Sequence, residues 1–236
     1  MIELYSGTPG SGKSLHAASV IRSRLMLGKP VLGNFPVATE NIRLPRNPFS
    51  KAPRKSPNYI QLHNHYFTKE EKLKPVYEEI YPDGTFGLIP EWLCKFSAEY
   101  FGGKPVKEDE ILLVIDEAQL VFNARTWDGV GRERWNAFFT QHRKYGYRII
   151  VIAQFDRMLD MQLRSLLEYE LVHRKLTNFG WRGWFLSALM LSTHMFVAVK
   201  VWYPLQEKVG SDFFRYSRKC ASIYDTHATW MLSAET

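Results

Sequence analysis

The feature that most constrains the fold of this chain is a glycine-rich stretch at its amino terminus. An apolar run over residues 1–5 leads directly into it, and the stretch follows the pattern G-x-x-x-x-G-K-S. Its residues are Gly7, Thr8, Pro9, Gly10, Ser11, Gly12, Lys13 and Ser14, followed by Leu15. Glycines let the backbone turn its N–H groups inward, and a helix beginning near Lys13 directs its positive end at the same point. A loop of this kind holds phosphate mainly through its backbone.

Two side chains of the loop complete the predicted site. Lys13 would reach the β- and γ-phosphates of ATP, and the Ser14 hydroxyl would hold Mg²⁺. Apolar residues at helical spacing follow the loop, and Gly28 and Pro30 end the predicted helix in the expected order. Because a strand precedes the loop and a helix follows it, we favour a nucleotide site over a glycine-rich turn that merely caps a helix.

A second signal lies about 100 residues further on, where five apolar residues run into two carboxylates. Residues 111–115 are typical of a strand buried on both faces of a parallel sheet, and Asp116 and Glu117 follow it directly. Asp116 is the expected partner of the Mg²⁺, either direct or through water. Glu117 is placed to polarise a water for attack on the γ-phosphate. The alternative is that Glu117 only favours a helix dipole.

A third apolar strand, residues 148–153, ends at the polar residue Gln154. At the ligand-binding edge of the sheet, Gln154 would sense the γ-phosphate, although a strand terminus without a role is the alternative. Arg143 precedes this strand and is the leading candidate for an arginine that a neighbouring copy supplies to stabilise transition-state charge. The alternative is a solvated basic helix face. Other candidates are Arg125, Arg132 and Arg164.

The order of elements predicts an α/β P-loop NTPase with a doubly wound, mainly parallel sheet. A stretch over 36–109 is too long for a simple loop and is expected to form an inserted subdomain. Residues 1–175 would be the ATPase domain, and residues 176–236 a helix and strand extension near a membrane. The expected strands are 1–6, 30–34, 58–62, 111–115, 148–153 and 169–175. The expected helices are 13–27, 68–80, 90–101, 132–145 and 156–168.

One apolar segment, residues 183–199, has no charged side chain and is flanked by aromatic residues. Its length is at the lower limit for a membrane span. Polar residues in its middle favour a break between a short helix over 184–191 and a strand over 195–203, because a polar centre in a span is costly. A helix lying on a membrane surface is the remaining alternative.

Composition and charge limit the class of protein. The chain has 236 residues, 45% of them hydrophobic, which suffices for a folded core. A net charge of +7 favours an anionic partner without choosing among nucleotide, nucleic acid and membrane surface. Cys94 and Cys220 are far apart and indicate neither a disulfide framework nor a zinc site. The amino terminus lacks the layout of a signal peptide, so we expect the loop to stay in the cytosol.

A basic, proline-rich segment over 43–55 lies in a stretch without acidic residues. Such a segment could contact single-stranded DNA, acidic lipid or an acidic protein surface. A solvated loop is the plain alternative.

Several of these motifs together resemble known families. A glutamate after the strand's aspartate, with a further apolar strand, is similar to the additional-strand, catalytic-glutamate division of P-loop ATPases. The ordered set resembles the Zot (zonula occludens toxin) family, which includes the assembly and export ATPases of filamentous bacteriophages. The stretches that carry this resemblance are 111–119 (ILLVIDEAQ), 123–127 (NARTW), 142–146 (HRKYG), 160–164 (DMQLR) and 224–226 (YDT).

The resemblance implies a role in the cell. It implies a Mg²⁺-dependent ATPase on the cytoplasmic side of the host inner membrane, working with phage coat and assembly proteins and an outer-membrane channel in virion extrusion. It implies a membrane anchor in a segment at the end of, or outside, this sequence. Separately, an arginine supplied by a neighbouring copy, as in ring ATPases, would make hydrolysis require a homo-oligomer, with a ring as the expected form. The alternatives are a DNA-translocating or packaging ATPase, and a non-hydrolysing scaffold or toxin domain.

Overall fold

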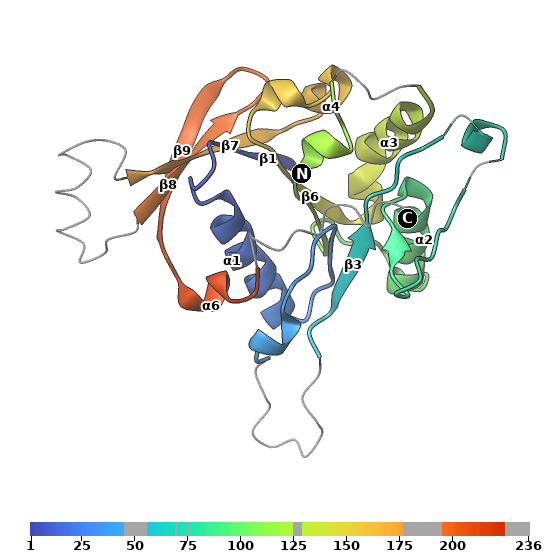
Figure 1. Cartoon of the computed structure of the whole chain (residues 1–236), viewed down its shortest axis with the longest axis horizontal. Helices are drawn as coiled ribbons and strands as arrows, with labels where there is room; N and C mark the ends of the chain where they lie inside the picture. Colours follow the sequence, from blue (N-terminus) through green and yellow to red (C-terminus); the bar gives the residue numbers. More distant parts are fainter. Residues whose placement is uncertain (45–55, 69, 75, 125–128, 177–194, 225–236) are drawn as a thin grey trace, which may run out of the picture.

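A mixed β-sheet organises the molecule. The computed structural model describes residues 1–44, 56–68, 70–74, 76–124, 129–176 and 195–224. Within these residues, nine strands form one sheet in the order β4-β3-β2-β5-β6-β1-β7-β8-β9 (Figure 1). The strands are β1 (Ile2–Ser6), β2 (Val31–Gly33), β3 (Tyr59–His63), β4 (Phe86–Gly87), β5 (Ile111–Ile115), β6 (Tyr147–Ile152), β7 (Tyr169–Lys175), β8 (Met195–Trp202) and β9 (Glu207–Arg215).

The direction of the strands divides the sheet into two parts. Every pairing among β1 to β7 is parallel, whereas β8 runs antiparallel to β7 and β9 antiparallel to β8. Strand β6 lies between β1, which leads into the glycine-rich loop, and β5, which leads into the acidic pair. The predicted α/β P-loop fold with an additional central strand is therefore confirmed.

Both faces of the sheet are covered by helices. Helices α1 (Lys13–Met26) and α6 (Arg218–Ala221) lie on one face, and α2 (Pro90–Phe101), α3 (Gly129–Gln141) and α4 (Met161–Ser165) lie on the other (Figure 1). The sequence of β5 is apolar throughout because both of its faces are buried. Leu112 and Val114 pack toward α1, and Leu113 and Ile115 pack toward α2 and α3. A central strand of a parallel sheet has no solvated face.

Most predicted elements occur close to their expected places. The helices over 13–27 and 90–101 are α1 and α2, and the strand expected over 195–203 is β8. The helix expected over 184–191 lies outside the described residues. The segment 36–109 contributes β3 and β4 to one edge of the sheet and α2 to one of its faces. Strands β7 to β9 form the opposite edge.

The prediction of a helix over 68–80 is wrong. Among the described residues of this range, the structure has one short 3₁₀ turn, η2 (Glu70–Lys72), and the chain from Val76 to Glu79 is not helical. The sequence contains Pro75 in the middle of this stretch, and a proline there removes a helical hydrogen bond and clashes with the preceding turn. The Glu71 carboxylate accepts from the Thr68 N–H, a contact typical of the start of a helix, and also contacts His65 at 2.9 Å, but the helix does not continue.

The helix predicted over 156–168 is broken into two pieces. A 3₁₀ turn, η5 (Asp156–Met158), is followed by α4, whose first residues are capped by Asp160. The Asp160 side chain accepts from the Gln162 N–H at 2.8 Å, so it starts a new helix rather than continuing one. The helix expected over 132–145 is α3, and its last turn is the 3₁₀ turn η4 (His142–Tyr145).

Candidate nucleotide-binding site

The glycine-rich loop joins β1 to α1 at the carboxyl edge of the parallel strands. Gly7, Gly10 and Gly12 all have positive φ angles, of 139°, 74° and 96°. A side chain at Gly7 would place its Cβ 2.5 Å from the His173 carbonyl oxygen, and one at Gly12 would place it 2.7 Å from the Phe196 ring. Both the backbone conformation and the close neighbours therefore require glycine at these two positions.

Lys13 folds back over this loop. Its Nζ donates to the carbonyl oxygens of Gly7 at 2.6 Å and Thr8 at 3.3 Å. Burial lowers the pKa of Lys13, and the negative charges of Glu117 and Asp116 oppose this shift. The ammonium group therefore lies between the loop and the acidic pair, as a phosphate-binding lysine requires.

Asp116 is buried at the end of β5, and four hydrogen bonds hold it. Its carboxylate accepts from the Glu117 N–H at 2.9 Å and from the Tyr224 hydroxyl. Asn34, at the end of β2, brackets its backbone, because the amide oxygen accepts from the Asp116 N–H at 2.7 Å and the amide nitrogen donates to the Asp116 carbonyl at 2.9 Å. Desolvation by burial raises the pKa of Asp116.

Ser14 and Asp116 come together across the sheet edge. The Tyr224 hydroxyl donates to the Asp116 carboxylate. The Ser14 side chain lies close enough to oppose the rise in pKa that burial causes at Tyr224. The two predicted metal ligands therefore lie beside the same hydroxyl in one cavity. Burial next to Asp116 raises the pKa of Tyr224. The groups that could bind a metal here are a hydroxyl and a carboxylate, and Mg²⁺ prefers oxygen ligands of this kind. The residues present therefore fit a Mg²⁺ ion bound together with nucleotide phosphates.

Glu117 has an unusual backbone conformation. Its φ of 46° and ψ of 44° place it in the left-handed region, which is uncommon for a residue with a side chain. Its carboxylate is partly exposed to the cavity and accepts from the Gln119 amide. The left-handed backbone of Glu117 separates its side chain from that of Asp116. A strained backbone conformation of this kind often accompanies a functional site.

Gln154 lies directly after β6, between the loop and the acidic pair. Its backbone carbonyl accepts from the Gly7 N–H at 3.1 Å, which ties the start of the loop to the central strand. Its side chain lines the cavity that contains the loop and the acidic pair. Gln154 is therefore where a γ-phosphate sensor would lie.

A cavity of about 1380 Å³ contains these groups. It lies between the loop, the acidic pair, the chain after β2, and the carboxyl-terminal segment around α6. Its lining includes residues 9–15, Pro36 to Ala38, Asp116, Glu117, Gln154, Phe196 and Cys220 to Tyr224. The volume is sufficient for a nucleoside triphosphate.

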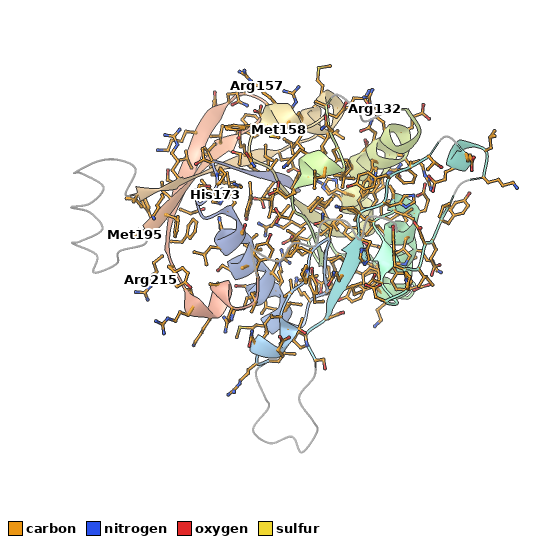
Figure 2. The ribbon with its side chains drawn as sticks, in the orientation of Figure 1. Arg132, Arg157, Met158, His173, Met195 and Arg215 are labelled. Atoms are coloured by element: carbon orange, nitrogen blue, oxygen red, sulfur yellow. The ribbon has the colours of Figure 1, made fainter. Side chains whose placement is uncertain are left out.

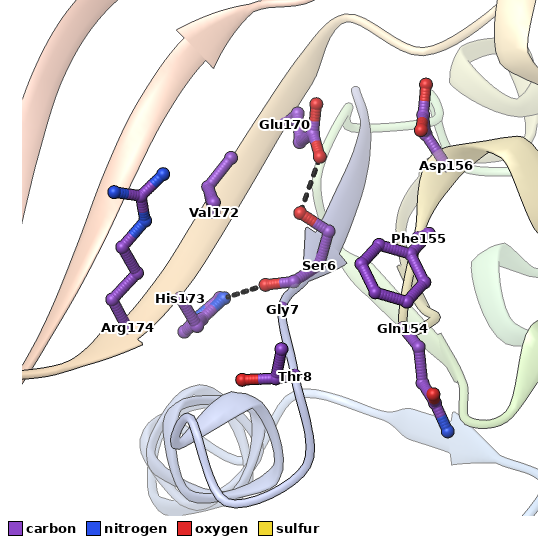
Figure 3. A pocket seen from close by; sticks show the side chains of 10 residues that line it. All are labelled: Ser6, Gly7, Thr8, Gln154, Phe155, Asp156, Glu170, Val172, His173 and Arg174. Carbon is purple, nitrogen blue, oxygen red and sulfur yellow. Dashed lines mark hydrogen bonds between the residues drawn. The ribbon is translucent and has the colours of Figure 1, made fainter. Parts of the chain in front are cut away.

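A smaller pocket, of about 430 Å³, adjoins the loop at the carboxyl ends of β1, β6 and β7 (Figure 3). The Ser6 hydroxyl donates to Glu170 at 2.5 Å, and the His173 ring bonds the Ser6 carbonyl at 3.2 Å. Phe155 and Asp156 form the facing wall. These contacts fix the chain where β1 turns into the loop.

Arg143 does not belong to this site within its own chain. It lies in η4, before β6, and therefore at the amino ends of the parallel strands, whereas the loop lies at their carboxyl ends. Its guanidinium pairs with Glu168 at 2.7 Å, close to the amino terminus of Met1. Arg132, in α3, pairs with Asp160 at 3.0 Å, and Arg125 lies outside the described residues. Any contact of Arg143 with nucleotide would have to be made in another copy.

Some residues of the site were not predicted. Asn34 and Tyr224 contact Asp116 from positions 82 and 108 residues away in the chain. The stretch beginning at Tyr224 carried a family resemblance, which was the one available signal for that residue. No local pattern indicated Asn34.

The parallel sheet with its central β6, the glycine-rich loop and the acidic pair define the fold and site of a P-loop NTPase. The profile of the family described as zonular occludens toxin (Zot) matches residues 1–229. The chain belongs to the Zot family. The resemblance identified in the sequence is therefore confirmed.

Solved structures show likenesses at low sequence identity. The N-terminal domain of zonular occludens toxin from Neisseria meningitidis is 20% identical, with 95% of this chain and 98% of that chain covered and a TM-score of 0.49. The genome packaging NTPase from Sulfolobus turreted icosahedral virus 2, in complex with ATP-gammaS, is 11% identical, with 91% and 96% covered and a TM-score of 0.47. No curated protein sequence matches the chain. The family assignment rests on the sequence match over residues 1–229.

Proposed function

We propose that this chain binds ATP with Mg²⁺ and hydrolyses it to drive assembly and extrusion of a filamentous phage across the host inner membrane. One observation carries the ATPase part of the proposal. Ser14 and Asp116, which follow β1 and β5 on either side of β6, line the same cavity beside the glycine-rich loop, and the Tyr224 hydroxyl lies next to both. In P-loop NTPases, a loop serine and a strand-end aspartate at these places together hold the Mg²⁺ of the metal–nucleotide complex.

The side chains of the site divide the work of hydrolysis. The loop N–H groups and Lys13 would hold the phosphates and orient the γ-phosphate. Glu117, whose carboxylate faces the cavity, would accept a proton from the attacking water, and Gln154 would contact the γ-phosphate from the end of β6. A bound Mg²⁺ ion would neutralise developing charge on the β- and γ-phosphates. Glu117 is in turn held by the Gln119 amide.

The site also supports action as an oligomer. Among the described residues that line the 1380 Å³ cavity there is no arginine. A neighbouring copy in a homo-oligomer, for which we propose a ring, would supply a guanidinium that stabilises charge in the transition state. Arg143 is our candidate for this residue, acting in the site of another copy.

Family membership supports the cellular part of the proposal. We place this domain on the cytoplasmic side of the host inner membrane, working with coat and assembly proteins and an outer-membrane channel. Among the described residues, none of the helices combines the length and apolar character needed to cross a membrane. Fractionation of phage-producing cells, followed by immunodetection of the full chain, tests this placement. Recovery only outside the membrane fraction would contradict it.

Substitution of Lys13 tests nucleotide binding. Lys13→Ala should weaken ATP affinity roughly 10- to 100-fold, because a charge-assisted contact to phosphate is lost, and turnover should fall with it. Equilibrium binding of a fluorescent ATP analogue and phosphate release would be measured.

Lys29→Ala is the matched control for this experiment. Lys29 follows α1 at its far end and pairs with Glu110 at 2.8 Å, so its loss should leave nucleotide affinity unchanged. If Lys13→Ala binds and turns over ATP like the wild type, the proposed ATPase is refuted and a non-hydrolysing scaffold or toxin domain is favoured.

A DNA-translocating ATPase is the second candidate function. The net charge of +7 and the basic segment 43–55 favour an anionic partner. Single-stranded DNA should then stimulate turnover, and its affinity should fall steeply with salt. Turnover that is indifferent to DNA would leave the extrusion motor as the preferred function.

A further inference from the structure

The Tyr224 hydroxyl occupies the point where the two predicted metal ligands meet. It donates to the Asp116 carboxylate and lies beside the Ser14 side chain in the same cavity. Tyr224 is 8% exposed, so this contact is shielded from solvent. The residue lies 108 positions after Asp116 and belongs to none of the sequence motifs that define the site.

The segment that carries Tyr224 is anchored independently of the acidic pair. The Ile223 carbonyl accepts from the Ala38 N–H at 3.0 Å, and the Ser222 carbonyl accepts from the Asn41 amide at 2.8 Å. Cys220 and Ile223 are buried in the same core as the apolar residues of α1, which α6 accompanies (Figure 1). The Tyr224 ring packs edge-on against Phe35, with centroids 4.7 Å apart. The fold of residues 218–224 therefore delivers the hydroxyl to Asp116.

The other hydrogen bonds of Asp116 leave its Oδ2 atom free to accept from Tyr224. The Glu117 N–H binds Oδ1, and Asn34 fixes the backbone, whereas Tyr224 binds Oδ2. A carboxylate offers about four lone-pair sites, so two hydrogen bonds leave capacity for a metal or its water. Carboxylates that bind metals are generally held by hydrogen bonds of this kind.

We propose that Tyr224 is a positioning residue for the metal–nucleotide complex, and that the site is complete only when residues 218–224 are docked against α1. Its hydroxyl turns Asp116 toward Ser14, which aligns a carboxylate and a hydroxyl for one Mg²⁺. This inference rests on the proposed ATPase function. It adds a long-range contact through which the carboxyl-terminal segment controls metal binding.

The test compares nucleotide affinity with and without magnesium. Tyr224→Phe in the full chain removes the hydroxyl and keeps the ring against Phe35. A fluorescent ATP analogue would be titrated in excess Mg²⁺ and again in EDTA, and Mg²⁺ would be titrated at fixed nucleotide. Affinity in Mg²⁺ should fall roughly 10-fold, as for the loss of other hydrogen bonds to metal ligands, and affinity in EDTA should not change.

Tyr59→Phe is the matched control. Tyr59 is a partly buried tyrosine on the same face of the sheet, and its hydroxyl donates to the Phe35 carbonyl rather than to Asp116. This variant makes the same chemical change beside the same phenylalanine. It should keep the magnesium dependence of the wild type, so a loss specific to Tyr224→Phe cannot come from general loosening.

The possible results separate this inference from the proposed function. If the wild type shows no nucleotide binding that magnesium strengthens, both fail. If the wild type does and Tyr224→Phe matches it, only this inference fails. Tighter magnesium binding by Tyr224→Phe would show that the hydroxyl competes with the metal, and an equal loss in Mg²⁺ and EDTA would show that it touches nucleotide. Either result also overturns the positioning role.

Discussion

Asp116 and Glu117 are adjacent in the sequence, yet the structure holds them in different ways. Asp116 directly follows the buried strand β5 and accepts hydrogen bonds from Asn34, Glu117 and Tyr224. Glu117 adopts a left-handed conformation and presents its carboxylate to the cavity. Two carboxylates in different environments can take different roles, and here one suits metal binding and the other proton transfer.

Glu117→Gln should separate binding from chemistry. The variant retains a side-chain oxygen for the Gln119 amide, so the turn should persist, but it cannot accept a proton from water. ATP affinity should stay within about twofold of the wild type, while single-turnover hydrolysis should slow by roughly 10²- to 10⁴-fold. Rapid-quench measurement of phosphate release would give the rate.

Glu110→Gln is the control for this substitution. Its carboxylate pairs with Lys29 on the surface, at 2.8 Å, away from the cavity. Hydrolysis should be unchanged. An unimpaired rate for Glu117→Gln would mean that another group activates the water.

Residues of the site that lie in local motifs were predictable, and those that meet through the fold were not. The loop 7–14 and the acidic pair each follow a strand whose apolar pattern is visible in the sequence. The sequence does not show on which side of the sheet Arg143 lies. The structure places it before β6, away from the glycine-rich loop of its own chain, which is compatible with the predicted role in the site of a neighbouring copy.

Strand β8 supports the glycine-rich loop directly. Its Phe196 ring lies against Gly12 and stacks on Phe214 of β9, with centroids 5.5 Å apart. The antiparallel edge of the sheet therefore contributes to the shape of the phosphate-binding loop. Close packing of this kind leaves no space for an added methyl group.

Gly12→Ala should reveal this contact. It adds a clash with Phe196, costing about 1–3 kcal/mol, to the strain of a positive φ, costing about 1–2 kcal/mol. Gly10→Ala is the matched variant, because Gly10 has a φ of 74° and nothing within 4 Å of an added Cβ. Urea unfolding should show the larger loss of stability for Gly12→Ala.

A double-mutant cycle assigns the difference to β8. Phe196→Ala removes the ring that the new methyl group meets, so its combination with Gly12→Ala should cost less than the sum of the two single changes. Strictly additive losses, or equal losses for Gly10→Ala and Gly12→Ala, would show that the loop does not depend on β8.

Elements with strong apolar periodicity were the ones predicted well. β5 and β6 are apolar runs of the length of a buried strand, and α1 and α2 carry clear helical spacing. β9 was missed because it is an edge strand with many exposed residues and no buried apolar run. The helix predicted over 68–80 is not formed beyond η2, because the sequence has a proline, Pro75, in the middle of that range.

At the scale of the whole molecule, a pair of histidines, the buried His173 and the partly buried His16, joins β7 to α1. His173 of β7 lies beside α1 (Figure 2), and its Nε2 is 2.9 Å from Nδ1 of His16. Burial lowers the pKa of both rings, so both are neutral near pH 7. In the neutral His173 ring, Nδ1 donates to the Ser6 carbonyl, and Nε2 therefore accepts from Nδ1 of His16.

This pair makes stability depend on pH. Desolvation and the neighbouring His16 lower the pKa of His173 to about 3, against an ordinary value of 6.5. Between these values the unfolded chain binds the proton and the folded chain does not, so this contribution to stability is lost as pH falls below 6.5. The melting temperature should decrease from pH 7 to pH 4.5.

His173→Gln tests the origin of this slope. The variant cannot take up a proton when it unfolds, so its melting temperature should decline less steeply with acid than that of the wild type, whatever its absolute stability. Differential scanning calorimetry across this pH range would measure both slopes. Parallel slopes would show that His173 is not the group responsible.

The sequence by itself determined the class of this protein, because phosphate binding by a glycine-rich loop and burial of a parallel strand are local requirements written in consecutive residues. Only the tertiary structure decided which distant residues complete the site. The contacts of Asn34, Phe196 and Tyr224 depend on strand order and on the return of α6 across α1. Such contacts arise from packing over long separations, and no spacing along the chain encodes them.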